Sequence, residues 1–369
     1  MALNCGIVGL PNVGKSTIFS ALSSAKAEAA NYPFCTIEPN TGIVPVPDPR
    51  LDRLVELFQP ERRIPAVVEF VDIAGLVAGA SKGEGLGNKF LAHIRETGIV
   101  AHVVRCFEDP DIVHVANRVD PINDIDVILT ELALADLDTV DKRLDKAQRS
   151  MRVLGGEQKK AAEHEVAALN KVRPALEQGR PASSVALSDE EAAEARGWFL
   201  LTMKPQIYVC NTDEDGVRNG NKHIDAVKAR AAAEGAEAVV ICGKFEAELA
   251  EMESEEDRLA FLSELGLAES GLSALIHAAY RLLGLRTFFT SGKDECRAWT
   301  IRAGDKAPQA AGVIHTDFER GFIKADVYSY ADIDELGSEA ALRSAGKLRT
   351  EGKDYVVQDG DVMFFKFNV

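Results

Sequence analysis

The sequence of 369 residues has no long apolar run and no sign of a leader. It contains no stretch of about 18 apolar residues, which is the length that a membrane-spanning helix needs. Its first residues, Met1 to Asn4, lack the basic and apolar regions of a signal peptide. We therefore expect a soluble, cytoplasmic protein that does not associate with membranes.

Cysteines are few, and none of the six stands in C-x-x-C spacing. This pattern argues against a structural zinc site and against a disulfide framework. Four of the cysteines lie within or at the end of apolar runs, where cysteine behaves as a small hydrophobic residue. Cys35 differs because it stands beside a candidate switch residue, and it is either a redox-sensitive thiol or another small apolar side chain.

Positive charge is also scarce, since 42 Lys and Arg residues face 58 Asp and Glu residues for a net charge of −16. Such a chain repels nucleic acid at long range, so a nucleic-acid partner would require a local basic patch. We expect no readout of DNA sequence. The candidates for a patch are Arg343, Lys347, Arg349 and Lys353, although a solvated helix face explains them equally well.

A glycine-rich loop from Gly9 to Thr17 matches the pattern G-x-x-x-x-G-K-[ST]. The strand-like run Cys5–Val8 precedes it and the helix-like segment Ser16–Ala27 follows, which is the context that a phosphate-binding loop requires. Glycine lets successive backbone N–H groups point at a phosphate chain in front of a helix N-terminus. Lys15 would reach the β- and γ-phosphates. The expected nucleotide contacts are Asn12, Val13, Gly14, Lys15, Ser16 and Thr17.

Short apolar runs alternate with helical patterns along much of the chain, which indicates an α/β fold with a mostly parallel sheet covered on both faces. The clearest predicted strands are Cys5–Val8, Val67–Val71, Ile99–Arg105, Ile207–Cys210 and Ala238–Cys242. A polar or glycine-containing motif follows four of these strands. Because ligands of such sheets bind beyond the carboxyl ends of the strands, we expect the four motifs to meet in one crevice.

Three oxygen-bearing side chains are candidates to hold Mg²⁺ with the nucleotide. They are Ser16, Thr36 in a Pro-rich loop, and Asp72 at the end of the second strand. The N–H of Gly75 would contact the γ-phosphate, and the glycine-rich stretch after it suits a second switch loop. Leu76 stands where Ras-like GTPases carry a Gln, and Leu cannot orient water, so catalytic help must come from elsewhere.

Two residues could supply that help, and each has a plainer explanation. His114 lies on a segment that could swing over the γ-phosphate, but a lone His is more often structural. Asn12 could hold a K⁺ ion whose charge replaces an arginine finger, or it could merely solvate the loop. The sequence leaves both alternatives open.

The base-recognition motif departs from the N-K-x-D motif of GTPases. Thr212 replaces the Lys, and Glu214 replaces the Asp whose carboxylate accepts hydrogen bonds from guanine. Adenine has no 2-amino group to offer such a carboxylate, and the loss of a matched hydrogen-bonding site costs specificity on the order of 10⁴. We therefore expect a weakened preference for guanine, with ATP accepted. Asn211 and backbone groups near Thr212 and near Gly243, which follows Cys242, would read the 6-amino edge of adenine.

Four regions follow from these patterns: a nucleotide domain in two parts, 1–132 and 202–282, a helical insertion at 133–201 and a C-terminal α+β domain at 283–369. In the insertion, apolar residues recur at three- and four-residue steps from Leu137 to Leu154, which predicts a coiled-coil hairpin broken at Gly155-Gly156. In the last domain we expect a helix over Ala340–Glu351 and a strand over Tyr355–Val357, followed by a hairpin turn.

Taken together, the phosphate loop, the segment Tyr32 to Thr36, the run Asp72 to Leu76 and the N-x-x-E at Asn211 resemble the Obg-like ATPases of the YchF group of P-loop proteins. The resemblance covers almost the whole chain. It implies a TGS domain of β-grasp fold at the C-terminus and a cytosolic, Mg²⁺-dependent ATPase that prefers ATP to GTP. It also implies association with ribosomes, as a regulator of translation or of stress responses, and a catalytic role for His114.

Three functions remain as hypotheses. The first is a slow ATP-hydrolysing switch in which the terminal phosphate orders the loops around Thr36 and Gly75. A variant of this first hypothesis is an enzyme that prefers GTP. The second hypothesis is a ribosome- or RNA-binding adaptor that keeps nucleotide only as a structural ligand. A metabolic kinase is the third, but the sequence shows no acceptor pocket.

Overall fold

The computed structural model describes residues 3–24, 40–73, 86–116, 118–153, 155–252 and 254–368. Thr36, Gly75, Leu76 and Cys35 lie outside these residues. Contacts divide the chain into two compact units. The first unit contains the residues up to Gly42 and Glu69–Leu275, and the second contains Ile43–Val68 and Ile276–Val369.

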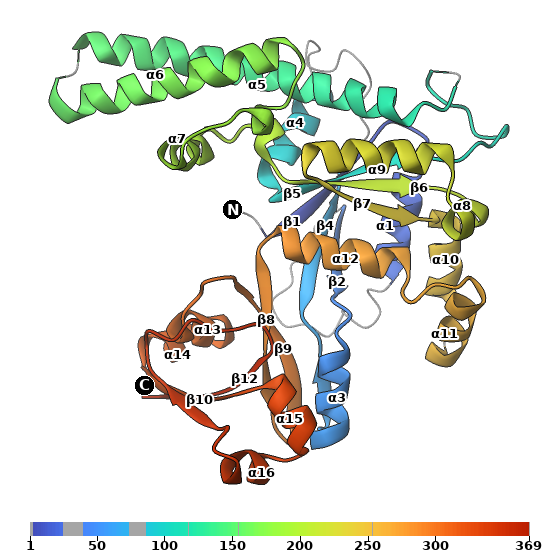
Figure 1. Ribbon diagram of the computed structural model, residues 1–369, viewed down its shortest axis with the longest axis vertical. Helices are drawn as coiled ribbons and strands as arrows, with labels where there is room; N and C mark the ends of the chain where they lie inside the picture. The colour runs from blue at the N-terminus through green and yellow to red at the C-terminus, as the bar shows by residue number, and fades with distance from the viewer. Residues whose placement is uncertain are drawn as a thin grey trace. The chain divides into compact units, whose positions relative to one another are not determined.

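The first unit is built on a six-stranded sheet in the order β2-β4-β1-β5-β6-β7 (Figure 1). β1 pairs in parallel with β4 and β5, and β6 pairs in parallel with β5 and β7. The parallel sheet predicted from the sequence is confirmed, so the carboxyl ends of these strands lie at one edge. The strands are β1 (Asn4–Val8), β2 (Thr41–Pro45), β4 (Val67–Asp72), β5 (Ile99–Arg105), β6 (Gln206–Asn211) and β7 (Glu237–Ile241).

α5 and α9 cover part of this sheet because each carries an apolar stripe. α5 and α9 pack on β5 and β6 through a shared core in which Ile125 and Leu129 meet Tyr208 and Val227. In the described residues, the α-helices that lie wholly in the first unit are α1 (Lys15–Ser24), α4 (Leu86–Glu96), α5 (Pro121–Val153), α6 (Gly156–Glu177), α7 (Asp189–Ala195), α8 (Glu214–Asn219), α9 (Lys222–Glu234), α10 (Gly243–Glu251) and α11 (Glu255–Glu264). Short 3₁₀ turns follow the arm at η2 (Ala182–Ser184), η3 (Arg196–Trp198) and η4 (Leu201–Met203).

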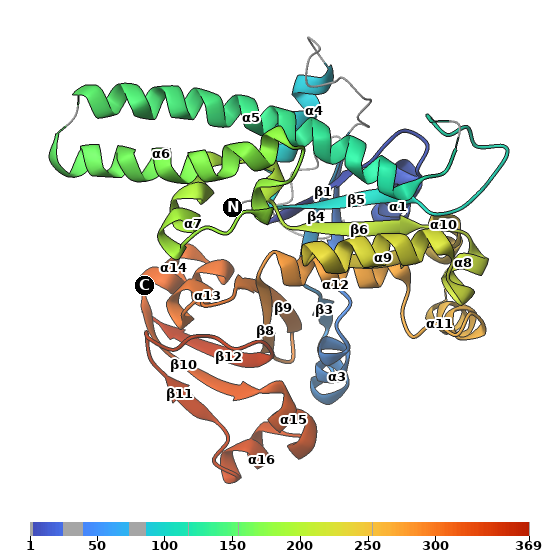
Figure 2. The ribbon, with the colours of Figure 1, turned by 45° about the horizontal axis from the view of Figure 1, so that its top comes forward.

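The distal part of α5 and α6 forms an antiparallel arm that extends beyond the sheet of the same unit (Figures 1 and 2). Val140 and Leu144 of α5 pack against Leu169 and Val172 of α6 in a core of their own. The predicted break is confirmed, because α6 begins at Gly156 and Gly155 is its N-cap. α5 begins at Pro121, earlier than the insertion predicted from 133. None of the helices in the described part of the chain, α5 included, combines the length and hydropathy that crossing a bilayer requires.

The base of the arm is fixed by the buried carboxylate of Asp136. It accepts hydrogen bonds from the Leu201 and Thr202 backbone N–H groups at 2.8 Å each and from the Thr202 hydroxyl at 2.7 Å. Burial raises the pKa of Asp136, and these three donors lower it. The chain that returns from the arm is therefore tied to α5 where it re-enters the sheet. Beyond the arm, Ser188 and Glu191 form a capping box at the start of α7.

The second unit has a mixed six-stranded sheet in the order β11-β10-β12-β8-β9-β3, which confirms the α+β prediction. β8 pairs antiparallel with β9 and parallel with β12. Its strands are β3 (Arg62–Ile64), β8 (Leu285–Ser291), β9 (Glu295–Arg302), β10 (Phe322–Ser329), β11 (Arg349–Glu351) and β12 (Asp361–Phe367). Its helices are α3 (Pro49–Phe58), α13 (Ala307–Ile314), α14 (Thr316–Arg320), α15 (Tyr330–Leu336) and α16 (Glu339–Ser344), and α12 (Gly271–Leu282) leads into it.

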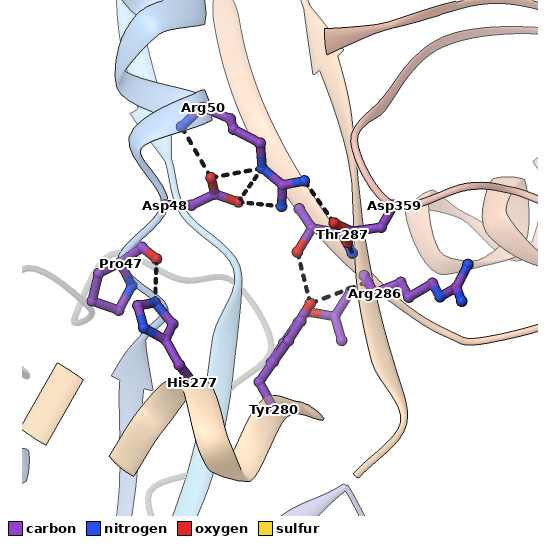
Figure 3. A network of polar contacts seen from close by, with 9 residues as sticks. Pro47, Asp48, Arg50, His277, Tyr280, Arg286, Thr287 and Asp359 are labelled. Atoms are coloured by element: carbon purple, nitrogen blue, oxygen red, sulfur yellow. Dashed lines mark hydrogen bonds and ion pairs between the residues drawn. The ribbon is translucent and has the colours of Figure 1, made fainter. Parts of the chain in front are cut away.

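The sequence pattern did not predict that residues 43–68 belong to this second unit. Figure 3 shows how they are held there. Arg50 donates to Asp48, the N-cap of α3, at 2.9 Å and to Asp359 at 2.6 Å, and Asp359 accepts the Thr287 N–H at 2.8 Å. His277 donates to the Pro47 carbonyl at 2.8 Å. Residues 43–68, which include α3 and β3, therefore belong to the second unit.

Two local predictions in the second unit are wrong. The helix expected over Ala340–Glu351 ends at Ser344, because Gly346 takes a left-handed φ of 67° and turns the chain into β11. The expected strand over Tyr355–Val357 makes only an isolated bridge between Val356 and Lys306. In both cases tertiary pairing overrides local propensity.

Candidate nucleotide site

The phosphate loop between β1 and α1 needs glycine at two positions. Gly9 has a φ of 154° and Gly14 a φ of 95°, which L side chains rarely adopt. A Cβ at Gly14 would lie 2.1 Å from Asn211 Nδ2, and one at Gly9 would lie 2.5 Å from the Val103 carbonyl oxygen. The loop is therefore shaped both by its own conformation and by the strands packed behind it.

Lys15 begins α1 and is only 8% exposed. Its Nζ donates a 2.7 Å hydrogen bond to the Leu10 carbonyl within the same loop. Burial lowers the pKa of Lys15, and the nearby Asp72 carboxylate raises it. The side chain is thus held over the loop, where an anionic ligand would offer its ammonium group a stronger partner than a carbonyl.

Asn211, at the end of β6, joins three segments of the site. Its Nδ2 donates to the Val13 carbonyl at 2.8 Å, and its Oδ1 accepts the Gly243 N–H at 3.0 Å. Thr212 next to it is buried and donates to the Cys106 carbonyl at 3.2 Å. The expected meeting of these strand ends is confirmed. The Asn211 amide already holds the phosphate loop to the loop at Gly243, so both ends of the side chain are engaged.

The other candidates for base recognition share the same edge of the sheet. Cys242 is the N-cap of α10 and is 4% exposed. Burial raises the pKa of its thiol, the Phe245 and Lys244 backbone N–H groups lower it, and the negative charge of Glu214 raises it further. Glu214 itself is exposed at the first turn of α8, where a base could reach it.

Two of the three expected metal ligands lie in the described residues. Ser16 is exposed in the first turn of α1, and Asp72 is half-buried at the end of β4, where Ile7 is its register partner. Burial raises the pKa of Asp72, and the charge of Lys15 lowers it. No group of three or more His, Cys, Asp or Glu residues that could hold a metal occurs among the residues with described positions. A hydroxyl and a carboxylate fit a hard divalent cation that takes its other oxygens from phosphate and water.

His114 lies in the loop after β5 and is 5% exposed. The Ala116 backbone N–H donates to its Nδ1 at 3.1 Å, so Nδ1 carries no proton. The proton is on Nε2, which donates to Asp124 Oδ2 at 2.9 Å. Burial raises the pKa of Asp124, and His114 lowers it. Both ring nitrogens are thus engaged inside the protein.

Asp124 and Arg105 were not predicted from the sequence. Arg105 is buried and donates to the carbonyls of Phe107, Asp109 and Ile112 at 2.9 to 3.1 Å, so it holds the loop that carries His114. Asp124 belongs to the first turn of α5, ten residues after His114, and no motif spacing connects the two. Only the folded chain brings these groups together.

The loop of His114 also contacts the phosphate loop. Asn12 has a left-handed φ of 61°, and its Nδ2 donates to the Val113 carbonyl at 3.1 Å. Val113 and Val115, on either side of His114, are 68% and 50% exposed. A withdrawn histidine between two exposed valines therefore lies next to the predicted phosphate site.

The chain is similar to known proteins over its whole length. A family model described as 50S ribosome-binding GTPase matches residues 4–147, and the YchF-GTPase_C model, described as a protein of unknown function, matches residues 285–368. The chain is 56% identical to the ribosome-binding ATPase YchF of Haemophilus influenzae over 100% of both chains. It is 45% identical to Obg-like ATPase 1 of Caenorhabditis elegans over 99% of this chain and 92% of that protein. Among solved structures, the Schizosaccharomyces pombe YchF GTPase matches with a TM-score of 0.89 and 41% identity, over 99% of this chain and 97% of that one.

Proposed function

The chain belongs to the YchF family of P-loop NTPases, and from this premise we propose that it is an ATPase that binds ribosomes in the cytoplasm. It hydrolyses ATP to ADP and phosphate. The observation that carries the proposal is the phosphate loop, with its two positive-φ glycines, its buried Lys15 and its hydrogen bond to Asn211. Such a loop at the start of α1 turns backbone N–H groups toward a triphosphate.

A divalent metal accompanies the nucleotide in such a site, and Mg²⁺ is the ion that we propose here. Ser16 and Asp72, which lie in the described part of the chain, would hold this ion together with Thr36, which lies outside it. The bound ion would neutralise charge on the phosphates. The residues of the chain act beside it: Lys15 exchanges the Leu10 carbonyl for phosphate oxygens, and the loop N–H groups orient the chain of phosphates. The Gly75 N–H, outside the described residues, would contact the terminal phosphate.

ATP is the preferred nucleotide in this proposal, although the names of the relatives differ between ATPase and GTPase. Glu214 stands where a guanine-binding site carries Asp, and Thr212 is turned inward to the Cys106 carbonyl. Because the Asn211 amide is engaged by the two loops, backbone groups near Thr212 and Gly243 would read the 6-amino edge of adenine, and Glu214 would lie beside the base without the matched donors that guanine offers. ATP and GTP competing for one fluorescent nucleotide test this proposal, and a strong preference for GTP would contradict it.

His114 is the proposed catalytic residue, and its position defines what must happen before hydrolysis. A neutral imidazole can orient or deprotonate water, but here its free nitrogen accepts from Ala116 and its N–H is used by Asp124. The loop must therefore open and turn His114 toward the phosphates. We expect slow turnover without a partner and faster turnover when a partner, the ribosome, binds.

The experiment that tests the function measures phosphate release with and without ribosomes. Hydrolysis of ATP that ribosomes accelerate is the expected result and supports the switch. No turnover in either condition would instead favour an adaptor that keeps nucleotide as a structural ligand. Sedimentation with ribosomes in ATP, in ADP and without nucleotide shows which state binds.

A further inference from the structure

The charge of the α5–α6 arm changes sign along its length. The sheet-proximal part of α5, residues 121–141, contains six acidic residues and no Lys or Arg. Residues 142–160, which we call the arm tip, contain seven Lys or Arg against two acidic residues. A basic segment this dense is unexpected in a chain whose net charge is −16.

The arm tip has no described core that would explain these residues. The last buried side chain of α5 is Ala147 and the first of α6 is Ala162. Lys146, Arg149 and Arg152 recur at three-residue steps on α5, and all are exposed. Lys159 and Lys160 are exposed on the first turns of α6. The basic groups therefore face solvent from both helices.

Several of these charges are not neutralised within the protein. Among the residues whose positions are described, Lys146, Arg152 and Lys160 have no ion-pair partner, and Arg149 and Lys159 make only long contacts of 3.7 and 3.9 Å with exposed carboxylates. Such exposed pairs contribute about 0 to 1 kcal/mol. The positive potential of the arm tip is thus available to a partner.

The C-terminal patch considered from the sequence is different. There Lys347 pairs with Asp332 at 3.0 Å, and Arg349 pairs with Glu351 at 3.5 Å and with Asp361 at 3.7 Å. Two of its four basic side chains, Lys347 and Arg349, are thus paired inside their own unit. The contrast favours the arm tip, with its larger number of basic side chains, over this patch among the described residues.

We propose that the arm tip binds the phosphate backbone of RNA, in an exposed segment of ribosomal RNA. This rests on the proposed ribosome binding and adds the contact surface and its chemistry. Closely spaced Lys and Arg side chains match a row of phosphates. A protein partner would need an apolar anchor, and a membrane surface would need an apolar helix face. Val153, which is 86% exposed, is the one large apolar side chain that is strongly exposed among the described residues of the tip.

The test compares two triple variants that remove the same charge. The tip variant carries Lys146→Ala, Arg152→Ala and Lys160→Ala. The control carries Arg343→Ala, Lys347→Ala and Lys353→Ala, which are also exposed. Binding to ribosomes by sedimentation, and to refolded ribosomal RNA by filter binding, is measured from about 50 to 200 mM KCl, a range over which phosphate contacts lose most of their affinity.

The tip variant should bind both probes on the order of tenfold more weakly, and its slope of log affinity against log salt should be smaller by about two to three. The control should bind like the wild type, and the melting temperature and basal ATPase rate should be unchanged in both. A tip variant with wild-type affinity and slope would overturn the inference, as would an equal loss in the control. Loss of ribosome binding with RNA binding absent or unaltered would assign the tip to a ribosomal protein and overturn the RNA assignment. Failure of the wild type to sediment with ribosomes would instead overturn the proposed function.

Discussion

The phosphate loop and the loop of residues 106–116 follow neighbouring parallel strands, yet they present their working groups in opposite ways. The phosphate loop after β1 holds its glycines, Lys15 and backbone N–H groups in the conformation that a phosphate chain requires. The loop after β5 holds His114 inward, against Asp124 and the Ala116 N–H. The difference teaches that nucleotide binding and the proposed catalytic role of His114 are separable, because His114 could act on the nucleotide only after it exchanged these two partners.

Replacing His114 with Ala should give the largest effect and should divide the two loops most clearly. If His114 acts on the attacking water, single-turnover hydrolysis should fall by about 10² to 10⁴-fold, while ATP affinity changes little. Rapid-quench measurement of hydrolysis and calorimetric titration of ATP check the two halves. His93→Ala, on the exposed face of α4, is the matched control. An unchanged rate in the His114 variant would remove this residue from the mechanism.

Replacing Lys15 with Ala tests the role of the phosphate loop in ATP binding. The variant lacks the ammonium group and so loses its charge-assisted hydrogen bonds to two phosphates of ATP. These bonds contribute about 3 kcal/mol together, so ATP affinity should fall about 100-fold. Stability should not fall with it, because the variant also removes a buried charge whose pKa burial lowers. Calorimetry and thermal melting measure both, with the exposed Lys89→Ala as control. Unaltered affinity would mean that the triphosphate binds elsewhere.

The two loops also differ in how far the sequence predicts them. The phosphate loop is a local motif, so its position, its glycines and its flanking strand and helix were predicted and are confirmed. The sequence identified His114 as a candidate, but it did not predict which groups its ring nitrogens contact. Those contacts depend on Asp124 of α5 and on the loop that Arg105 holds, and no motif spacing in the sequence indicates them. The assignment of residues 43–68 to the second unit escaped prediction for the same reason: Arg50 and Asp359 are more than 300 positions apart.

Replacing Asp124 with Asn should loosen the withdrawn state of His114. The amide keeps the shape and can still accept the Nε2–H, but it lacks the charge that strengthens this bond, so His114 should leave more often. Asp124 Oδ1 is buried without a hydrogen-bond partner among the described residues, and burial raises the pKa of this carboxyl. We expect basal ATP hydrolysis without ribosomes to rise about three- to tenfold, a change of about 1 kcal/mol in the opening equilibrium.

The pH dependence of stability checks the same residue independently of activity. Because the folded pKa of Asp124 is raised, the folded state binds the proton more readily than the unfolded state, so this group destabilises the fold above its pKa and is relieved as pH falls. The Asn variant should therefore melt higher than the wild type at neutral pH, and the difference should shrink toward acidic pH.

The rate of hydrolysis by the same variant could contradict the expected loosening of His114. If the Asn variant hydrolyses ATP more slowly than the wild type with ATP affinity unchanged, Asp124 orients His114 in the active state.

Replacing Asn12 with Gly should give the smallest effect, and it probes the hydrogen bond that joins the two loops in the described part of the chain. Glycine keeps the left-handed φ of 61° without strain, so the variant removes only the side chain and its 3.1 Å bond to the Val113 carbonyl. An exposed neutral hydrogen bond contributes about 0.5 kcal/mol, so ATP affinity and basal hydrolysis should change by no more than about twofold.

The rates of ATP hydrolysis in KCl and in NaCl distinguish the two roles left open for Asn12. If Asn12 only tethers and solvates the loop, the ratio of the two rates stays as in the wild type. If it helps to hold K⁺, the advantage of KCl is lost, and the two loops are then coupled through a cation as well as through a hydrogen bond.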